Sequence, residues 1–330
     1  MMKRRGFITL LGGAAAWPLA ARAQQPPQPV RRIGVLMTNA EHDSEAQQRV
    51  KALNQGLEKL GWAPGRTVRI DYRFAIVDAD RARNSAAELV ALAPDVILAH
   101  TPAMVAALKQ ATDTIPIVFV QASDPITLRV VTGLSHPSGN VTGFVLFEPS
   151  LAGKWLQFLT EVSPRIARAL VLQGAANPSS EGFLRSLQAV ASSPRVSLES
   201  TEVRDASDIE RAVSAIAAHP DSGLIVFPSP IATAQRDLII RLAARHRLPA
   251  VYPFRFFVTA GGLMFYGANN IDQWRQAASY VDRIFLGTHP RDLPIQLPTK
   301  FDLAINLKTA KALGLEIPPT LLARADEVIE

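Results

Sequence analysis

The stretch from Asp95 to Pro125 constrains the fold most, because it runs from strand to helix to strand with almost nothing between them. Residues 96–99 and 115–120 are nearly continuous apolar runs, which are typical of parallel strands buried on both faces. Pro102 stands where the intervening helix should begin, a position that proline tolerates well. This order of elements predicts an α/β domain built around a parallel sheet.

The same alternation of strand and helix occurs twice along the chain. Strands are predicted at 33–37, 68–74, 95–99, 115–120, 167–172, 196–203, 223–227, 249–253 and 263–267. The segments between most of these runs have apolar residues at helical spacing, as in 207–218. We therefore expect two doubly wound parallel-sheet lobes of α/β class, joined by more than one crossing segment.

The predicted boundaries follow these two series of elements. They are 1–23 for an export signal, 24–31 for a linker, 32–146 plus 257–292 for lobe 1, 147–256 plus 299–330 for lobe 2, and 293–298 for a crossing segment.

The first 23 residues have the three parts of a cleaved export signal. Lys3, Arg4 and Arg5 precede an apolar run, and Ala21-Arg22-Ala23 provides a small-residue cleavage site. The run is shorter than the ~20 residues that a membrane-spanning helix needs. The adjacent arginines before Gly-Phe-Ile favour the twin-arginine route, so we expect a soluble periplasmic protein.

Charge and cysteine content exclude several classes of function. The signal holds four basic residues and no acid, so its removal lowers the net charge from +6 to +2. A mature chain of that charge without a basic stripe gives no support to nucleic-acid binding. The chain has no cysteine, which excludes disulfides, thiolate metal ligands, a cysteine nucleophile and a lipid-anchored cysteine.

Small polar residues follow the strands of the first series, where parallel sheets bind ligands. Thr101, with Pro102 behind it, can hold a carboxylate through its hydroxyl and the free amides of the next helix, or it can simply cap that helix. Ser123 and Asp124 are candidates to bind the solute, and Asp124 can instead stabilise the turn before Pro125. Asn39 ends the first strand and should lie beside Thr101.

The facing wall of the cleft should come from the second series. Asn177, Ser229 and Tyr252 occupy the corresponding strand ends, so we predict that they bind the solute. Phe144 and Tyr266, like Phe147 and Phe254, are candidates for aromatic walls, although core packing is the more common role for such residues.

No motif for catalysis, metal binding or nucleotide binding occurs in the chain. The six histidines form no i, i+3 or i, i+4 pair, and there is no G-x-S-x-G, G-x-G-x-x-G or P-loop motif. We therefore predict no catalytic residue, no metal and no cofactor.

The chain resembles a family of ABC-transporter substrate-binding proteins, once classed as a domain of unknown function. The residues that carry the resemblance are Ser123-Asp124-Pro125, 139–143, Gly261-Gly262-Leu263-Met264, 278–284, 293–301, 305–311 and 322–329. The resemblance covers nearly all of the mature chain and implies a periplasmic binding-protein (type I-like) fold, with three crossovers around a central cleft. It also implies an aromatic amino acid as ligand, and Phe144 stands where the family usually has a small polar residue.

The prediction that best joins these features is a periplasmic receptor that closes around a small polar or amino-acid-like solute. Its partners would be that solute and the membrane permease of an ABC-type importer, and we expect a monomer. An exported α/β enzyme such as a hydrolase, and a ligand-responsive regulator, are the alternatives, since a fold does not determine a function.

Overall fold

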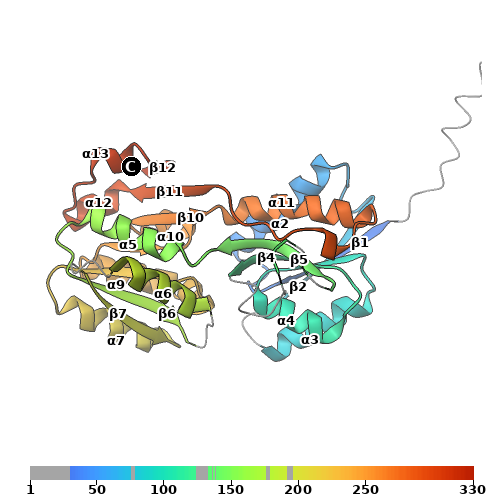
Figure 1. Ribbon diagram of the computed structural model, residues 1–330, viewed down its shortest axis with the longest axis horizontal. Helices are drawn as coiled ribbons and strands as arrows, with labels where there is room; N and C mark the ends of the chain where they lie inside the picture. The colour runs from blue at the N-terminus through green and yellow to red at the C-terminus, as the bar shows by residue number, and fades with distance from the viewer. Residues whose placement is uncertain are drawn as a thin grey trace, which may run out of the picture.

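The computed structural model describes residues 30–75, 79–123, 133–135, 137, 139–175, 179–191 and 196–330. These residues form two sheets, each with helices on both faces, and the two lobes lie side by side along the long axis (Figure 1). The predicted fold class is therefore confirmed.

Lobe 1 contains a five-stranded parallel sheet in the order β2-β1-β3-β4-β5. Its strands are β1 (Arg31–Met37), β2 (Val68–Phe74), β3 (Val96–Ala99), β4 (Ile117–Ser123) and β5 (Val141–Phe147). Helices α2 (Ser44–Lys59) and α11 (Asn270–Phe285) cover one face, and α3 (Ala79–Ala91) and α4 (Pro102–Ala111) cover the other. The whole of β3 is buried, as its continuous apolar run predicts.

Lobe 2 contains a seven-stranded sheet in the order β12-β11-β10-β9-β8-β6-β7, in which only β10 and β11 are antiparallel neighbours. Its strands are β6 (Arg168–Gly174), β7 (Ser197–Val203), β8 (Ser222–Val226), β9 (Ala250–Tyr252), β10 (Met264–Ala268), β11 (Phe301–Asn306) and β12 (Glu327–Ile329). Its helices are α5 (Leu151–Val162), α6 (Ser179–Ala191), α7 (Ala206–Ala217), α8 (Pro230–Ala234), α9 (Arg236–Arg245), α10 (Arg255–Thr259), α12 (Leu307–Leu313) and α13 (Pro319–Leu322).

The chain crosses between the lobes three times: after β5, between β10 and α11, and between the short 3₁₀ turn η1 (Pro290–Asp292) and β11 (Figure 1). The third crossing runs beside β5. The Val145 amide donates to the Gln296 carbonyl at 2.8 Å, and the Gln296 amide donates to the Gly143 carbonyl at 2.9 Å. These bonds tie two of the three crossings together at the base of the cleft.

One predicted boundary is corrected by the sheet topology. Residues 257–292 were expected in lobe 1, but β10 pairs with β9 and β11 and so belongs to lobe 2. The elements that follow it, α11 and η1, pack on lobe 1. A short apolar run such as Met264–Ala268 predicts a buried strand without indicating which sheet will receive it.

No described helix combines the length and the apolar composition that crossing a bilayer requires.

The close packing of α2 against α11 gives a test of this topology. A methyl group added at Gly56 would collide with the carbonyl oxygen of Arg275 and the Cβ of Ala278. We expect Gly56→Ala to lower the free energy of unfolding by about 1–3 kcal/mol in chemical denaturation, because two packed helices would have to separate. Lys51→Ala, at an exposed position of the same helix, is the control. Equal unfolding midpoints for the two variants would contradict the described packing.

Candidate functional site

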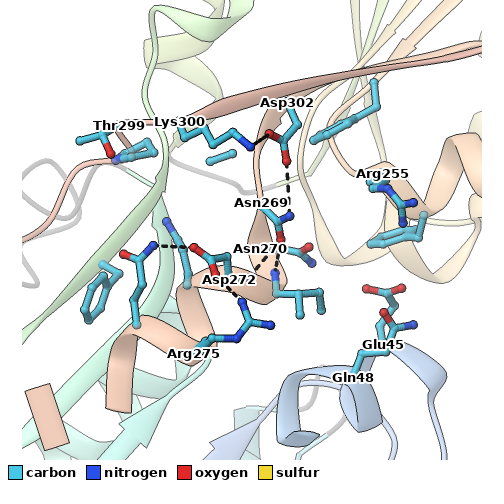
Figure 2. A pocket seen from close by; sticks show the side chains of 18 of the residues that line it. Glu45, Gln48, Arg255, Asn269, Asn270, Asp272, Arg275, Thr299, Lys300 and Asp302 are labelled. Atoms are coloured by element: carbon cyan, nitrogen blue, oxygen red, sulfur yellow. Dashed lines mark hydrogen bonds and ion pairs between the residues drawn. The ribbon is translucent and has the colours of Figure 1, made fainter. Parts of the chain in front are cut away.

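An open cavity of about 700 Å³ lies between the two lobes (Figure 2). Lobe 1 lines it with the first turns of α2 and α11, lobe 2 with α10 and β10, and the third crossing segment closes one side. Its charged lining residues are Glu45, Arg255, Asp272, Arg275, Lys300 and Asp302. The sequence analysis did not single out any of these residues.

Most of these charges are neutralised locally. Lys300 Nζ lies 3.2 Å from Asp302 Oδ1, and Asn269 Nδ2 donates to Asp302 Oδ2 at 3.3 Å. Asp272 pairs with Arg275 and accepts a bond from Gln276 Nε2 at 2.7 Å. These pairs leave the cavity polar but almost balanced in charge.

Glu45 is less well paired than the other acids of the cavity. It lies on α2 of lobe 1 and faces Arg255 of lobe 2 across the cavity, and Arg255 already forms a salt bridge with Glu327 (Figure 2). The nearest cation to Glu45 on its own lobe is Arg49, whose Nη2 is 3.8 Å from Oε2. Burial raises the pKa of the Glu45 carboxyl, and the charge of Arg49 offsets this only in part. The carboxylate is therefore suited to accept a cationic group.

The polar side chains at the strand ends of lobe 1 differ in whether they have hydrogen-bond partners. Asn39 is fully engaged, because its Oδ1 accepts from Arg49 Nη1 at 2.7 Å and its Nδ2 donates to Asp43 Oδ1 at 3.3 Å. Thr101 precedes α4 with Pro102 at the first helical position, as predicted, but its side chain does not cap the helix. Among the described residues, its buried hydroxyl has no hydrogen-bond partner. Of the two roles considered for Thr101, the structure therefore excludes capping of α4 by its side chain.

Ser123, at the end of β4, lies where the two lobes touch. Its carbonyl accepts from Ser179 Oγ of the facing lobe at 3.5 Å. Asp124 and Asn177, two further predicted binding residues, lie outside the described residues.

The predicted residues of lobe 2 and the aromatic walls are not brought together in the cavity. Ser229 Oγ accepts from the Ala232 amide at 3.2 Å and so caps α8. Tyr252 is corrected to a core residue, since it is 1% exposed and stacks on Phe257 with ring centroids 5.0 Å apart. Phe144 lines the cavity, but its ring packs on that of Tyr280.

Tyr266 is also corrected, because it lies on the wrong face of its strand. Side chains alternate along β10, and Phe265 lines the cavity. Tyr266 points to the other face, where its ring lies 4.8 Å from that of Phe158 and 5.8 Å from that of Phe301.

A buried polar cluster around His100 was missed by the sequence analysis. His100 Nδ1 lies 2.7 Å from Thr38 Oγ1, and His100 Nε2 bonds to Gln121 Oε1. Its ring is 5.7 Å from that of Trp274. Burial holds the pKa of His100 well below its usual value, and the charge of Arg49 lowers that pKa further. The imidazole is therefore neutral at physiological pH.

The sequence signal for this cluster was a polar residue after the apolar run of each of three neighbouring strands, β1, β3 and β4. Within the described part of the chain, no group of three or more histidine, aspartate or glutamate side chains could hold a metal ion.

Comparison with known proteins gives a consistent result. The family model described as "ABC transporter substrate binding protein" matches residues 32–329. A tyrosine-binding protein of Clostridioides difficile is 22% identical over 266 residues, which cover 81% of this chain and 76% of that protein.

Two solved structures share the fold over nearly the whole chain. A conserved domain protein from Vibrio cholerae is 25% identical with a TM-score of 0.83, over 91% of this chain and 99% of that one. An ABC domain from Streptococcus pneumonia in complex with L-Trp is 22% identical, with the same TM-score and the same coverage.

The buried neutral His100 predicts a specific dependence of stability on pH. Its folded pKa lies below the unfolded value of about 6.5, so the unfolded chain binds the extra proton as the pH falls below 6.5. The stabilisation is complete above that pH and is lost on acidification, with a slope of up to about 1.4 kcal/mol per pH unit. Urea denaturation between pH 7 and pH 5 should show a smaller loss of stability for His100→Gln. If the free energy of unfolding fell equally for the wild type and for His100→Gln between pH 7 and pH 5, the description of His100 as a buried neutral residue would be contradicted.

Proposed function

Since this chain belongs to the ABC transporter substrate-binding protein family, we propose that it is the receptor of an ABC importer for a free aromatic amino acid. Members of this family bind small solutes and deliver them to a membrane permease, and they are not a family of enzymes. The proposal concerns the class of solute, the residues that bind it and the closing of the lobes around it.

The observation that carries the proposal is a polar cavity between two lobes that are joined by three crossings. Such a joint permits hinge closure, in which a few residues between the lobes absorb the rotation. The bond from Ser179, at the start of α6, to the Ser123 carbonyl, at the end of β4, supports contact between the lobes on this side.

The arrangement of charge favours a zwitterion. Thr101 stands at the start of α4, whose first amides and positive dipole end attract a carboxylate, and its hydroxyl bonds to no described residue. Glu45 offers a partly buried carboxylate to an ammonium group. We propose these as ligand contacts, with Ser123 and Asp124 as further candidates beside Thr101.

The aromatic side chain of the solute has a candidate platform in lobe 2. Phe254 and Phe256 stack with ring centroids 5.0 Å apart, Phe147 packs edge-on against Phe254, and Phe256 lines the cavity. Aromatic pairs of this kind add about 0.5–1.5 kcal/mol beyond the area they bury. The relatives in C. difficile and S. pneumonia, described as tyrosine-binding and as an L-Trp complex, support the same class of solute.

Binding experiments test this proposal. L-tryptophan, L-tyrosine or L-phenylalanine should raise the melting temperature in a dose-dependent way, because a ligand that binds only the folded state stabilises it. Thr101→Val should weaken binding about tenfold with an unchanged melting temperature of the free protein, because the lost hydroxyl bonds a charged group of the ligand and no described residue. Thr114→Val, an exposed site beyond the far end of α4, is the control. No stabilisation by any of the three would exclude this class of solute.

We propose further that residues 1–23 direct export by the twin-arginine route and are then removed. The substrate-binding proteins of ABC importers act outside the cytoplasm, which agrees with the twin-arginine pattern at Arg4 and Arg5. Replacing both arginines by lysine should leave the protein in the cytoplasmic fraction with its signal uncleaved, as judged by immunoblotting. Unchanged export of the double-lysine variant would indicate the general secretory route.

A further inference from the structure

Gln121 has a backbone conformation that a glutamine rarely adopts. Its φ is +69°, and it is the extra residue of a β-bulge, since Val120 pairs with Phe144 and Ala122 with Val145. The left-handed region costs a non-glycine residue about 1–3 kcal/mol and persists where the surroundings hold it in place. Bulges also re-aim side chains next to functional sites. The chain therefore stabilises an unfavourable conformation near the carboxyl end of β4.

His100 fixes the orientation of the Gln121 side chain. The Thr38 backbone amide, which can only donate, points at His100 Nδ1 from 3.4 Å, so Nδ1 is an acceptor. The proton of the neutral ring is then on Nε2, which donates to Gln121 Oε1. Because the amide oxygen is held in this way, the Nε2 amino group of Gln121 must point away from His100.

That amino group has no hydrogen-bond partner among the residues that the structure describes. Gln121 is 8% exposed, and among the described residues no acceptor bonds to its buried Nε2. A buried N–H without an acceptor is costly, and a ligand that accepts the bond removes this cost. The contact between Ser123 and Ser179 lies two residues further along the same strand, so the facing lobe covers this edge when the lobes touch.

Thr101 lies at the same edge of the sheet as this donor. It follows His100 at the end of β3, and the His100 ring bonds to Gln121 near the end of β4. The side chains of Thr101 and Gln121 each have a buried polar group that bonds to no residue in the described part of the chain. Arg49, 2% exposed and with its nearest carboxylate 3.8 Å away, adds positive charge close to His100. Donors and positive charge together select an anionic oxygen.

We infer that the Gln121 amino group and the Thr101 hydroxyl together bind the carboxylate of the solute, and that His100 is the positioning residue that holds the Gln121 amide in place. The inference rests on the proposed function. It adds which residues recognise the carboxylate, the group that distinguishes a free amino acid from its decarboxylated amine. A solute without a carboxylate would leave both donors unpaired.

The experiment compares the affinity for L-tryptophan with that for tryptamine by isothermal titration calorimetry, with L-tyrosine and tyramine as a second pair. Gln121→Gly removes the amide and suits the positive φ, so the relief of backbone strain offsets the loss of the bond from His100 Nε2, and the melting temperature of the free variant checks that it folds. We expect it to weaken L-tryptophan binding about tenfold to a hundredfold, the loss of a bond to a charged group, and to leave tryptamine binding within about threefold. His100→Gln should also lower the ratio of the affinity for L-tryptophan to the affinity for tryptamine.

Gln173→Met is the matched control, because Gln173 is a buried glutamine at the end of β6 on the other lobe and bonds to Ser200. L-tryptophan and tryptamine both carry the ammonium group and the indole ring. This control should therefore leave the ratio of their affinities unchanged even if it weakens the binding of both. If the wild type binds L-tryptophan and Gln121→Gly retains the wild-type ratio, the inference is overturned and the proposed function stands. If the wild type binds none of the four compounds, the solute class is wrong and the inference falls with it.

Discussion

The packing of α11 on α2 is the interaction on which the two-lobe arrangement depends. The chain leaves lobe 2 at the end of β10 and enters α11 two residues later, so this helix belongs to lobe 1 by packing alone. Trp62 Nε1 donates to Asp282 Oδ1 at 2.9 Å, and the Trp62 ring packs edge-on against Phe285. With the third crossing bonded along β5, the lobes are joined by short connections that permit rotation without separation.

This joint brings different chemistry to the cleft from each side. Lobe 1 lines the cavity with Glu45 of α2, and at its strand ends the Thr101 hydroxyl and the Gln121 amino group are buried without a hydrogen-bond partner among the described residues. Lobe 2 presents aromatic rings after β9, of which Phe256 lines the cavity. A solute with a charged end and an apolar end would contact both, and it would favour the closed arrangement by the difference in its affinity for the two states.

Much of the fold could be predicted from the sequence because its signals are local. The apolar run of β3, the position of Pro102 and the helix expected at 207–218 all follow from composition and spacing, and the structure confirms them. Which sheet receives β10 depends on tertiary pairing, which a five-residue apolar run does not encode.

The site was harder to predict than the fold. Thr101 follows from its place between a strand and a helix, whereas Tyr252 is buried by its stacking on Phe257, a contact that only the folded chain shows. The position of Gln121 depends on a bulge, because a change of one residue in register turns a side chain to the other face.

The central claim is that the cleft closes around a free aromatic amino acid. Native mass spectrometry of the freshly purified protein, followed by analysis of the small molecule released on unfolding, tests it most directly. The account predicts one bound molecule per chain with the mass of tryptophan, tyrosine or phenylalanine. A bound sugar, nucleoside or other solute without a carboxylate would contradict it.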